Sequence, residues 1–132
     1  MSIIKLPDYR LKQKILYIDH TGDKILQNYG DLFFTEGNFS DALDFYQKAN
    51  FTEGLQKIKN AALKNGDTML FQRAAKALNL ELTPADWEII AKTAIDLKKY
   101  FFARHALEKV NNEELLNSLE KIMQAEEHEK LS

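Results

Sequence analysis

The stretch that decides the fold is YGDLFFTEGNFSDALDFYQKA, which runs from residue 29 to residue 49. Apolar and small side chains recur in it at spacings of three and four on both sides of one glycine, Gly37. This spacing puts the side chains on one face of a helix. Because glycine readily takes the left-handed conformation that ends a helix, we expect two helices joined by a tight reversal at Gly37.

The first helix of this pair is expected to begin before the stretch, so that the hairpin spans about residues 22–49. Thr21 and Ser40 are the expected N-caps of its two helices, because a hydroxyl can accept a hydrogen bond from a free amide at a helix start. Each helix carries an apolar stripe at helical spacing. The stripes are Ile25, Leu26, Tyr29, Leu32 and Phe33 in the first helix, and Ala42, Leu43, Phe45, Tyr46 and Ala49 in the second.

The arrangement recurs further along the chain and predicts a second hairpin over about residues 52–78. Thr52 is expected to cap its first helix, Gly66 to end that helix, and Asp67 to cap the next one. Both helices again carry apolar residues on one face, so the second hairpin has the same organisation as the first.

A third hairpin is expected over about residues 84–110, and it has the strongest helix start in the chain. Thr83 offers a hydroxyl to a free amide, Pro84 supplies a preset φ angle, and the carboxylate of Asp86 favours the positive end of a helix. Together these residues predict a helix that begins at Pro84.

The N-terminal end predicts a short helix ahead of the hairpins. Leu11, Ile15 and Ile18 recur there at spacings of four and three, as the apolar face of a helix requires. Pro7 fits the first turn of such a helix because its fixed φ angle suits a helix start. We therefore expect an N-terminal helix over residues 8–19.

The C-terminal end predicts a helix that caps the last hairpin over residues 112–123, with Asn112 as its N-cap. A polar tail follows over residues 124–132, and we expect it to fray. The apolar stripe of the capping helix is wider than one hairpin face requires. We expect a residual patch about Leu116 and Met123 to contact a partner or a second copy, which would give a homodimer.

Composition points to one fold class. The chain has 132 residues, the size of one domain, and only 5 glycines and 2 prolines, which suits helices joined by a few short turns. No segment alternates apolar and polar residues at a period of two. We therefore expect an all-α protein in which residues 1–132 form a single domain of antiparallel helical hairpins.

Charge and cysteine content exclude several classes of function. The chain has no cysteine, so it can form no disulfide, thiolate nucleophile or thiolate metal site. A formal net charge of -2 gives no reason to expect binding to nucleic acid or to an acidic membrane. The N-terminus lacks the apolar core of a secretory signal, and no stretch approaches the ~20 apolar residues of a membrane span. We expect a cytoplasmic protein.

The order of side chains in residues 29–49 resembles a tetratricopeptide (TPR) repeat. The small residues Gly30 and Ala42 are expected to face each other and to let the two helices approach closely. The family's order of large, small, aromatic, glycine, aromatic, alanine, aromatic and alanine is matched by Tyr29, Gly30, Phe33, Gly37, Phe39, Ala42, Tyr46 and Ala49.

The third hairpin resembles the same repeat and starts with the tryptophan that the family favours, a residue expected in the core. Its matching residues are Trp87, Ile90, Ala91, Tyr100, Ala103, Leu107 and Val110. It departs at Ala94, where the family has a large residue, and at Lys98, where glycine is usual. In the middle hairpin Lys59 and Phe71 stand where small residues are usual, so this hairpin is only loosely TPR-like.

The resemblance implies a short right-handed superhelix whose first helices line a concave surface for a peptide or a partner's helix. It implies that the partner-binding residues are Gln27, Asn28, Asp31 and Phe34 in the first hairpin, and Glu88 and Lys92 in the third. Some TPR proteins grip the C-terminal carboxylates of a chaperone on these faces. Asp31 would repel such a ligand, so that function is disfavoured.

The sequence contains no recognisable catalytic, cofactor-binding or metal-binding set. His20, His105 and His128 are dispersed, and none lies at ligand spacing from another. We expect a non-enzymatic adaptor or scaffold, without a cofactor, that binds a protein or peptide partner. The alternative is a small ligand-binding domain or enzyme with a pocket between hairpins near Trp87 and Tyr100.

Overall fold

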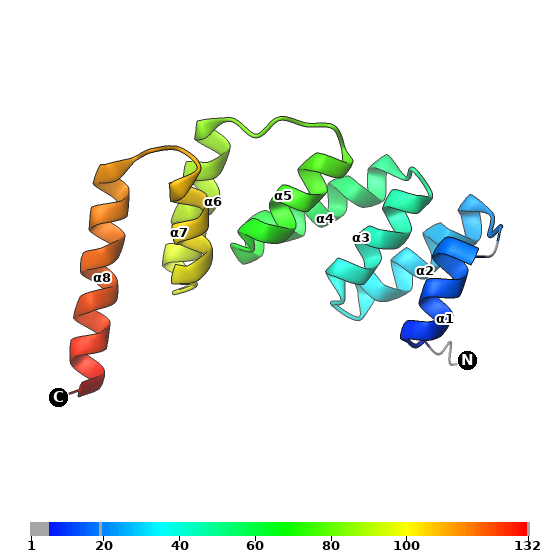
Figure 1. Ribbon diagram of the computed structural model, residues 1–132, viewed down its shortest axis with the longest axis horizontal. Coiled ribbons are helices and arrows are strands. Elements are labelled where there is room, and N and C mark those ends of the chain that lie inside the picture. The colour runs from blue at the N-terminus through cyan, green and yellow to red at the C-terminus, as the bar shows by residue number, and fades with distance from the viewer. Residues whose placement is uncertain (1–5, 19, 132) are drawn as a thin grey trace. The chain divides into compact units, whose positions relative to one another are not determined.

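The computed structural model describes residues 6–18 and 20–131, and every ordered element within these ranges is a helix (Figure 1). The prediction of an all-α chain is therefore confirmed for the described residues. The elements are α1 (Tyr9–Gln13), a π-helical turn η1 (Lys14–Ile18), α2 (Asp23–Thr35), α3 (Phe39–Lys48), α4 (Thr52–Asn65), α5 (Thr68–Ala77), α6 (Pro84–Asp96), α7 (Tyr100–Glu108) and α8 (Glu113–Leu131).

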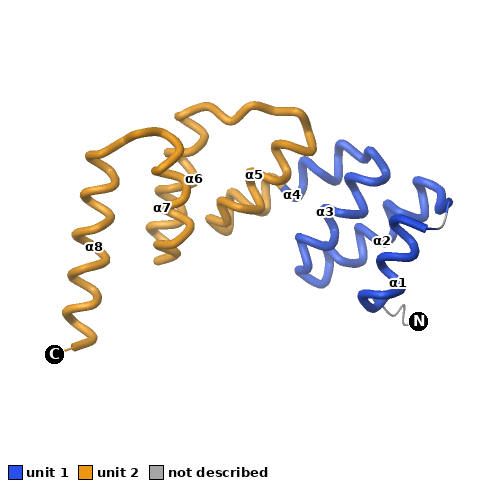
Figure 2. The backbone as a smooth tube through the Cα atoms, in the orientation of Figure 1, with its two compact units in different colours: residues 1–58 blue, residues 59–132 orange. Residues whose placement is uncertain are grey.

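The chain divides into two compact units, Met1–Ile58 (unit 1) and Lys59–Ser132 (unit 2), which Figure 2 shows in different colours. The boundary lies within α4, so the chain that was expected to form a single domain contains two compact units. In unit 1, α3 packs against α2 and η1. In unit 2, α7 packs against α5, α6 and α8.

The turns that end the helices share one backbone geometry. A residue in the left-handed conformation follows each helix from α2 to α7, and these residues are Gly37, Asn50, Gly66, Asn79, Lys98 and Asn111. Within each helix pair the two left-handed residues are 13 positions apart, from 37 to 50, from 66 to 79 and from 98 to 111. The three pairs thus repeat the same turn spacing along the chain.

Hydrogen bonds across five of these turns follow a single pattern. The amide of the residue after the left-handed position bonds back to a carbonyl in the last turn of the helix, as in a Schellman motif. The bonds are Asn38 N to Phe33 O at 2.9 Å, Phe51 N to Tyr46 O at 2.9 Å, Asp67 N to Ala62 O at 3.0 Å, Leu80 N to Ala75 O at 2.9 Å and Lys99 N to Ala94 O at 2.8 Å. These bonds satisfy carbonyls that the helix itself leaves free.

Three predicted helix starts are confirmed. The carboxylate of Asp67 accepts a hydrogen bond from the amide of Leu70 at 3.0 Å, as an N-cap of α5 should. Thr83 and Asp86 bond to each other's amides in a capping box at the start of α6. The side-chain oxygen of Asn112 caps α8.

Four other predicted helix starts were wrong. Thr52, which was expected to cap α4, is instead the first residue of that helix. Gly22, and not Thr21, is the N-cap of α2, and the Thr21 hydroxyl donates instead to the carbonyl of Ile15 at 3.3 Å. Ser40 lies inside α3, because the turn after Gly37 lets the helix begin at Phe39 with Asn38 as its N-cap. Pro7 precedes the first helix, which Asp8 caps.

A single tyrosine organises the core of unit 1. The Tyr46 side chain is fully buried, and a Cβ atom added at Gly30 or at Gly54 would lie 2.5 or 2.6 Å from its ring. The two glycines therefore leave the space that the ring fills. The sequence predicted that Gly30 makes room for Ala42; the nearest atoms to a side chain at Gly30 belong to Tyr46 instead, although Ala42 is fully buried.

Unit 2 packs around Trp87, which is 7% exposed, so the prediction that this residue is core is confirmed. Its ring makes edge contacts with Phe71 and His105, with centroids 6.5 and 5.8 Å apart. A Cβ atom added at Gly66 would lie 2.9 Å from the Cα atom of Ala94. This close approach of the turn to α6 explains why Ala94 stands where the first pair has a phenylalanine.

Both ends of the chain differ from the predictions. The predicted N-terminal stripe is wrong in part, because Leu11 and Ile18 are exposed while Ile15 is buried. Lys12 and Leu16 are buried together with Ile15, so the buried face of this segment is rotated from the predicted one. Asp19, the predicted end of this helix, lies outside the described residues. At the other end α8 continues to Leu131, so the tail over residues 124–131 is helical and does not fray as expected.

Candidate protein-binding surfaces

One face of α2 brings together three of the residues expected to bind a partner. Gln27, Asp31 and Phe34 are spaced by four and three residues and so share that face. Phe34 contacts the ring of Phe39, with centroids 5.0 Å apart. The Nζ atom of Lys57, on α4, lies 4.4 Å from the centroid of the Phe34 ring. We call Gln27, Asp31, Phe34 and Lys57 the α2–α4 surface.

Asp31 is held in place from inside the core. The buried Tyr46 hydroxyl donates a hydrogen bond of 2.5 Å to the carboxylate of Asp31. Burial raises the pKa of Tyr46 well above its ordinary value, and the hydrogen bond with Asp31 raises it further. The phenol therefore stays protonated and keeps Asp31 oriented on the surface.

Asn28 lies on a different face of α2 from this surface. Together with Ile25, Tyr29 and Leu32 it lines a small apolar hollow with a volume of about 180 Å³. The four predicted residues of α2 thus belong to two faces, and Asn28 does not join Gln27, Asp31 and Phe34.

The two predicted binding residues of α6, Glu88 and Lys92, are spaced by four positions, but their environments differ. Glu88 accepts a hydrogen bond of 3.3 Å from the side-chain amide of Asn112, which ties α6 to the start of α8. Lys92 is exposed. Glu88 therefore contributes to the internal packing of unit 2, and Lys92 is the one of the pair that faces solvent.

Leu116 and Met123, the predicted patch on α8, are both half-buried. Arg104 of α7 lies 3.5 Å from the sulfur of Met123 and 3.3 Å from the carboxylate of Glu120. The patch is therefore partly covered by the contact of α8 with α7, and it is smaller than the sequence suggested.

Tyr100 anchors the far part of α8. Its hydroxyl donates a hydrogen bond of 2.5 Å to Glu126. This bond, with smaller contributions from burial and from the charge of Glu126, raises the pKa of Tyr100 to about 12. The bond holds the residues that were expected to fray against α7.

A cleft with a volume of about 550 Å³ opens beside Trp87 in unit 2. It runs along the end of α5 and the connector to α6, and Tyr100 is not among its lining residues. Those residues are Gln72, Ala75, Lys76, Asn79, Leu80, Glu81, Leu82, Trp87 and Lys109. Of the two residues predicted for the alternative ligand pocket, only Trp87 lines it.

His105 packs against Trp87, which also lines this cleft. Its Nδ1 atom lies 3.1 Å from the Thr68 hydroxyl, and its ring contacts Trp87. Burial lowers the pKa of His105, as does the charge of Lys109, while Glu108 acts in the opposite direction. The neutral imidazole is favoured, which suits a ring that packs against an indole.

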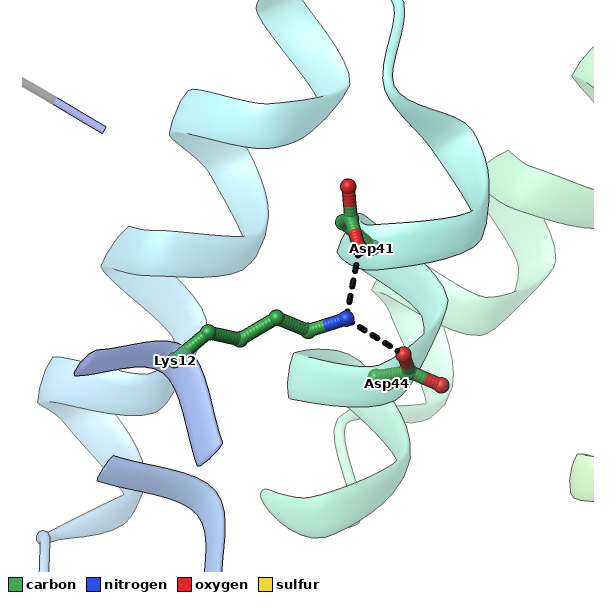
Figure 3. Close-up of polar contacts among 3 residues, drawn as sticks. All are labelled: Lys12, Asp41 and Asp44. Carbon is green, nitrogen blue, oxygen red and sulfur yellow. Dashed lines mark hydrogen bonds and ion pairs between the residues drawn. The ribbon is translucent and has the colours of Figure 1, made fainter. Parts of the chain in front are cut away.

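The sequence analysis missed a charged cluster in unit 1. The ammonium of Lys12 lies 2.5 Å from Asp41 Oδ1 and 2.8 Å from Asp44 Oδ2 (Figure 3). The only sequence signal was the spacing of the two aspartates, which places both carboxylates on one face of α3. Their partner, Lys12, is 29 positions from Asp41 and 32 from Asp44, and no local pattern identifies it.

Two classes of site are absent from the described part of the chain. Residues 6–18 and 20–131 contain no group of three or more histidine, aspartate or glutamate side chains that could hold a metal ion. None of the described helices is both long enough and apolar enough to cross a membrane.

Comparison of the chain with protein-family models, with curated protein sequences and with solved structures found no significant match.

Proposed function

We propose that the protein is a non-enzymatic adaptor or scaffold that binds a protein or peptide segment, with its helix pairs stacked as in a short TPR-like superhelix. The repeated spacing of the left-handed turn residues supports this proposal. So does Gly30, which stands at the family's small position and leaves room for an aromatic ring. The packing of α8 on α7 is the contact expected of a capping helix.

The observation that carries the proposal is the composition of the α2–α4 surface. Phe34 is half-buried and so presents part of its ring to solvent, with a lysine over one face and Asp31 and Gln27 beside it on α2. An aromatic residue ringed by hydrogen-bonding groups is typical of the energetic centre of a protein interface. A partner's apolar side chain can pack on the Phe34 ring while its backbone or polar groups bond to Asp31, Gln27 and Lys57.

Affinity capture with matched variants tests this surface. The tagged protein is compared with Phe34→Ser and with Phe101→Ser, which removes an aromatic residue that is 74% exposed in unit 2. We expect the proteins retained by the wild type to be lost with Phe34→Ser and kept with Phe101→Ser. Equal retention by both variants, each folded as judged by circular dichroism, would show that the α2–α4 surface is not the binding site.

The terminal helix is the second surface of this proposal, because Leu116 and Met123 are only half-buried. We expect the double variant Leu116→Glu, Met123→Glu to lose a partner or a self-association that the wild type has. Sedimentation and affinity capture of the two proteins measure this. Identical mass, solubility and partners would remove α8 from the proposal.

The cleft beside Trp87 favours a second candidate, a ligand-binding function. The volume of about 550 Å³ falls within the range of small-molecule sites, and it borders the only tryptophan of the chain. A ligand there should shift the emission of Trp87 and raise the melting temperature. A library of metabolites that changes neither would speak against this candidate.

A further inference from the structure

The N-terminal segment, residues 6–18, packs against α3 within unit 1 as an amphipathic helical ligand would. Lys12, Ile15 and Leu16 are its buried residues, and they recur at spacings of three and four from Lys12. Four other large apolar side chains of the segment point away, since Tyr9, Leu11, Tyr17 and Ile18 are 75, 46, 66 and 71% exposed, while Leu6 is half-buried. One lysine and two apolar side chains thus make up the buried side of this contact.

The receiving site on α3 matches that lysine in charge. Asp41 and Asp44 lie one helical turn apart, and both reach the same ammonium, as Figure 3 shows. Burial lowers the pKa of Lys12, but the hydrogen bonds and charges of the two aspartates outweigh it, so the pKa lies above its ordinary value. None of these contacts requires that the segment and α3 belong to the same chain. The site can therefore bind the same segment from another copy.

The connection between the segment and α2 favours exchange. Its described residues are His20, Thr21 and Gly22, so the link is short. The segment ends in the π-helical turn η1, a rare helical geometry. Tyr17 and Ile18 before the link and Ile25 after it are more than half exposed, so large apolar side chains flank the point at which the chain would open.

We propose that the Lys12 site of unit 1 also accepts the N-terminal segment of a second copy, so that two chains exchange residues 6–18 and form a reciprocal dimer. The ion pairs of Lys12 with Asp41 and Asp44 are kept in such a dimer, and among the described residues only the hydrogen bond from Thr21 in the link to the Ile15 carbonyl is lost, which makes exchange a low-cost route to association. The two links run past each other where the chains cross. Tyr17, Ile18 and Ile25 of each copy then gain apolar neighbours that the monomer does not provide.

Charge reversal tests the exchange directly. One variant carries Lys12→Glu, and a second carries Asp41→Lys and Asp44→Lys. Neither variant can seat its own segment, because like charges meet in the site. In an equimolar mixture the segment that carries Lys12→Glu can pair with the site that carries Asp41→Lys and Asp44→Lys on the other chain. The unaltered Lys12 of the second variant can likewise pair with the unaltered Asp41 and Asp44 of the first. We expect each variant alone to be monomeric and the mixture to form a heterodimer of twice the mass in light scattering.

A third variant that combines all three reversals restores the pairing within one chain and is the control for folding. It should melt close to the wild type. A mixture that stays monomeric, while this control is folded, would overturn the proposal.

Shortening the link gives a second test that does not alter the site. A chain that lacks residues 20–22 cannot lead its segment back to its own α3, whereas a neighbour's site stays within reach. We expect this chain to be a dimer at all concentrations measured by light scattering, and addition of Asp41→Lys with Asp44→Lys to return it to a monomer. A link-shortened chain that is monomeric would contradict the exchange.

Discussion

Unit 1 and unit 2 are built from helix pairs with the same turn spacing, but they pack through different side chains. In unit 1 a tyrosine fills the space left by two glycines, Gly30 and Gly54. In unit 2 a tryptophan contacts Phe71 and His105, and the close approach falls at the turn residue Gly66. The comparison shows that turn spacing is retained, whereas the closest contact of a glycine is with a side chain in unit 1 and with backbone atoms in unit 2. Substitutions at the two places should therefore have different effects in the two units.

The largest effect is expected at Trp87. Trp87→Ala removes a 7% exposed ring from the core of unit 2 and should lower the free energy of unfolding by roughly 3–5 kcal/mol. Phe101→Ala, at a 74% exposed ring in the same unit, should change it by less than about 0.5 kcal/mol. Urea denaturation measures both. A loss of less than about 1 kcal/mol for Trp87→Ala would mean that this ring does not organise unit 2.

Alanine substitutions at two turn glycines, Gly37 and Gly66, distinguish the cost of backbone strain from the cost of overpacking. Gly37 and Gly66 both have positive φ angles, 79° and 67°, so alanine at either is strained by about 1–2 kcal/mol. An added Cβ atom meets nothing within 4 Å at Gly37 but lies 2.9 Å from the Ala94 backbone at Gly66. We expect Gly66→Ala to cost about 1–2 kcal/mol more than Gly37→Ala, an overpacking penalty. Equal losses in thermal denaturation would show that the turn does not press on α6.

The flanking helices of the two units are held by ion pairs of different burial. Lys12 has an 11% exposed side chain between two aspartates, whereas Arg104 and Glu120 are 43 and 55% exposed. Lys12→Met keeps most of the apolar stem and should cost about 1–2 kcal/mol, limited by the partial exposure of the aspartates. Arg104→Met should cost less than about 1 kcal/mol. Equal costs in urea denaturation would remove this distinction.

The ion pairs of Lys12 with Asp41 and Asp44 also affect how the stability of the chain depends on pH. Because the pKa of Lys12 is raised in the folded chain, its contribution to stability is fully present below the ordinary lysine pKa. That contribution is lost only as pH rises through the pKa that Lys12 has in the folded chain. It is therefore present over the whole neutral range. The difference in melting temperature between wild type and Lys12→Met should be constant from pH 6 to pH 9 and shrink only above about pH 10.4. A difference that disappears below pH 9 would be inconsistent with a raised pKa.

The smallest effect is expected at Lys98, where the third pair has a lysine in place of the glycine of the first two pairs. Its φ angle is 60°, a conformation that glycine adopts without strain. Its contact with Glu126 is 3.9 Å long and exposed, and so contributes little. Lys98→Gly should therefore stabilise the chain by about 0.5–1 kcal/mol, the relief of left-handed strain less the entropic cost of glycine. A lowered melting temperature would show that the lysine side chain has a role at this turn.

The sequence predicted the helices well because their signals are local. Gly37 and Gly66 mark turns through their backbone freedom, and Thr83 with Asp86 marks a helix start through a bond between neighbours. The predictions at Thr21 and Ser40 failed for different reasons. The Thr21 hydroxyl bonds to the carbonyl of Ile15, whereas the turn at Gly37 lets α3 begin before Ser40.

Contacts between distant residues could not be predicted in the same way. The space at Gly30 is filled by Tyr46, and the ammonium of Lys12 is bound by Asp41 and Asp44, through pairings that only the packed chain defines. Among the expected binding residues, Glu88 was taken up by a bond to Asn112 for the same reason. Helical periodicity shows which residues share a face, but it does not show what covers that face.

The central claim is that the α2–α4 surface binds a protein segment, and site-specific photocrosslinking tests it most directly. A photoreactive phenylalanine analogue is placed at Phe34 in one sample and at Phe101 in another, and each is irradiated in extract of the cells that make the protein. We expect one discrete crosslinked species at Phe34 that is reduced by Asp31→Lys, and none of that mass at Phe101. Absence of a crosslink at Phe34, or the same species at both positions, would contradict the account.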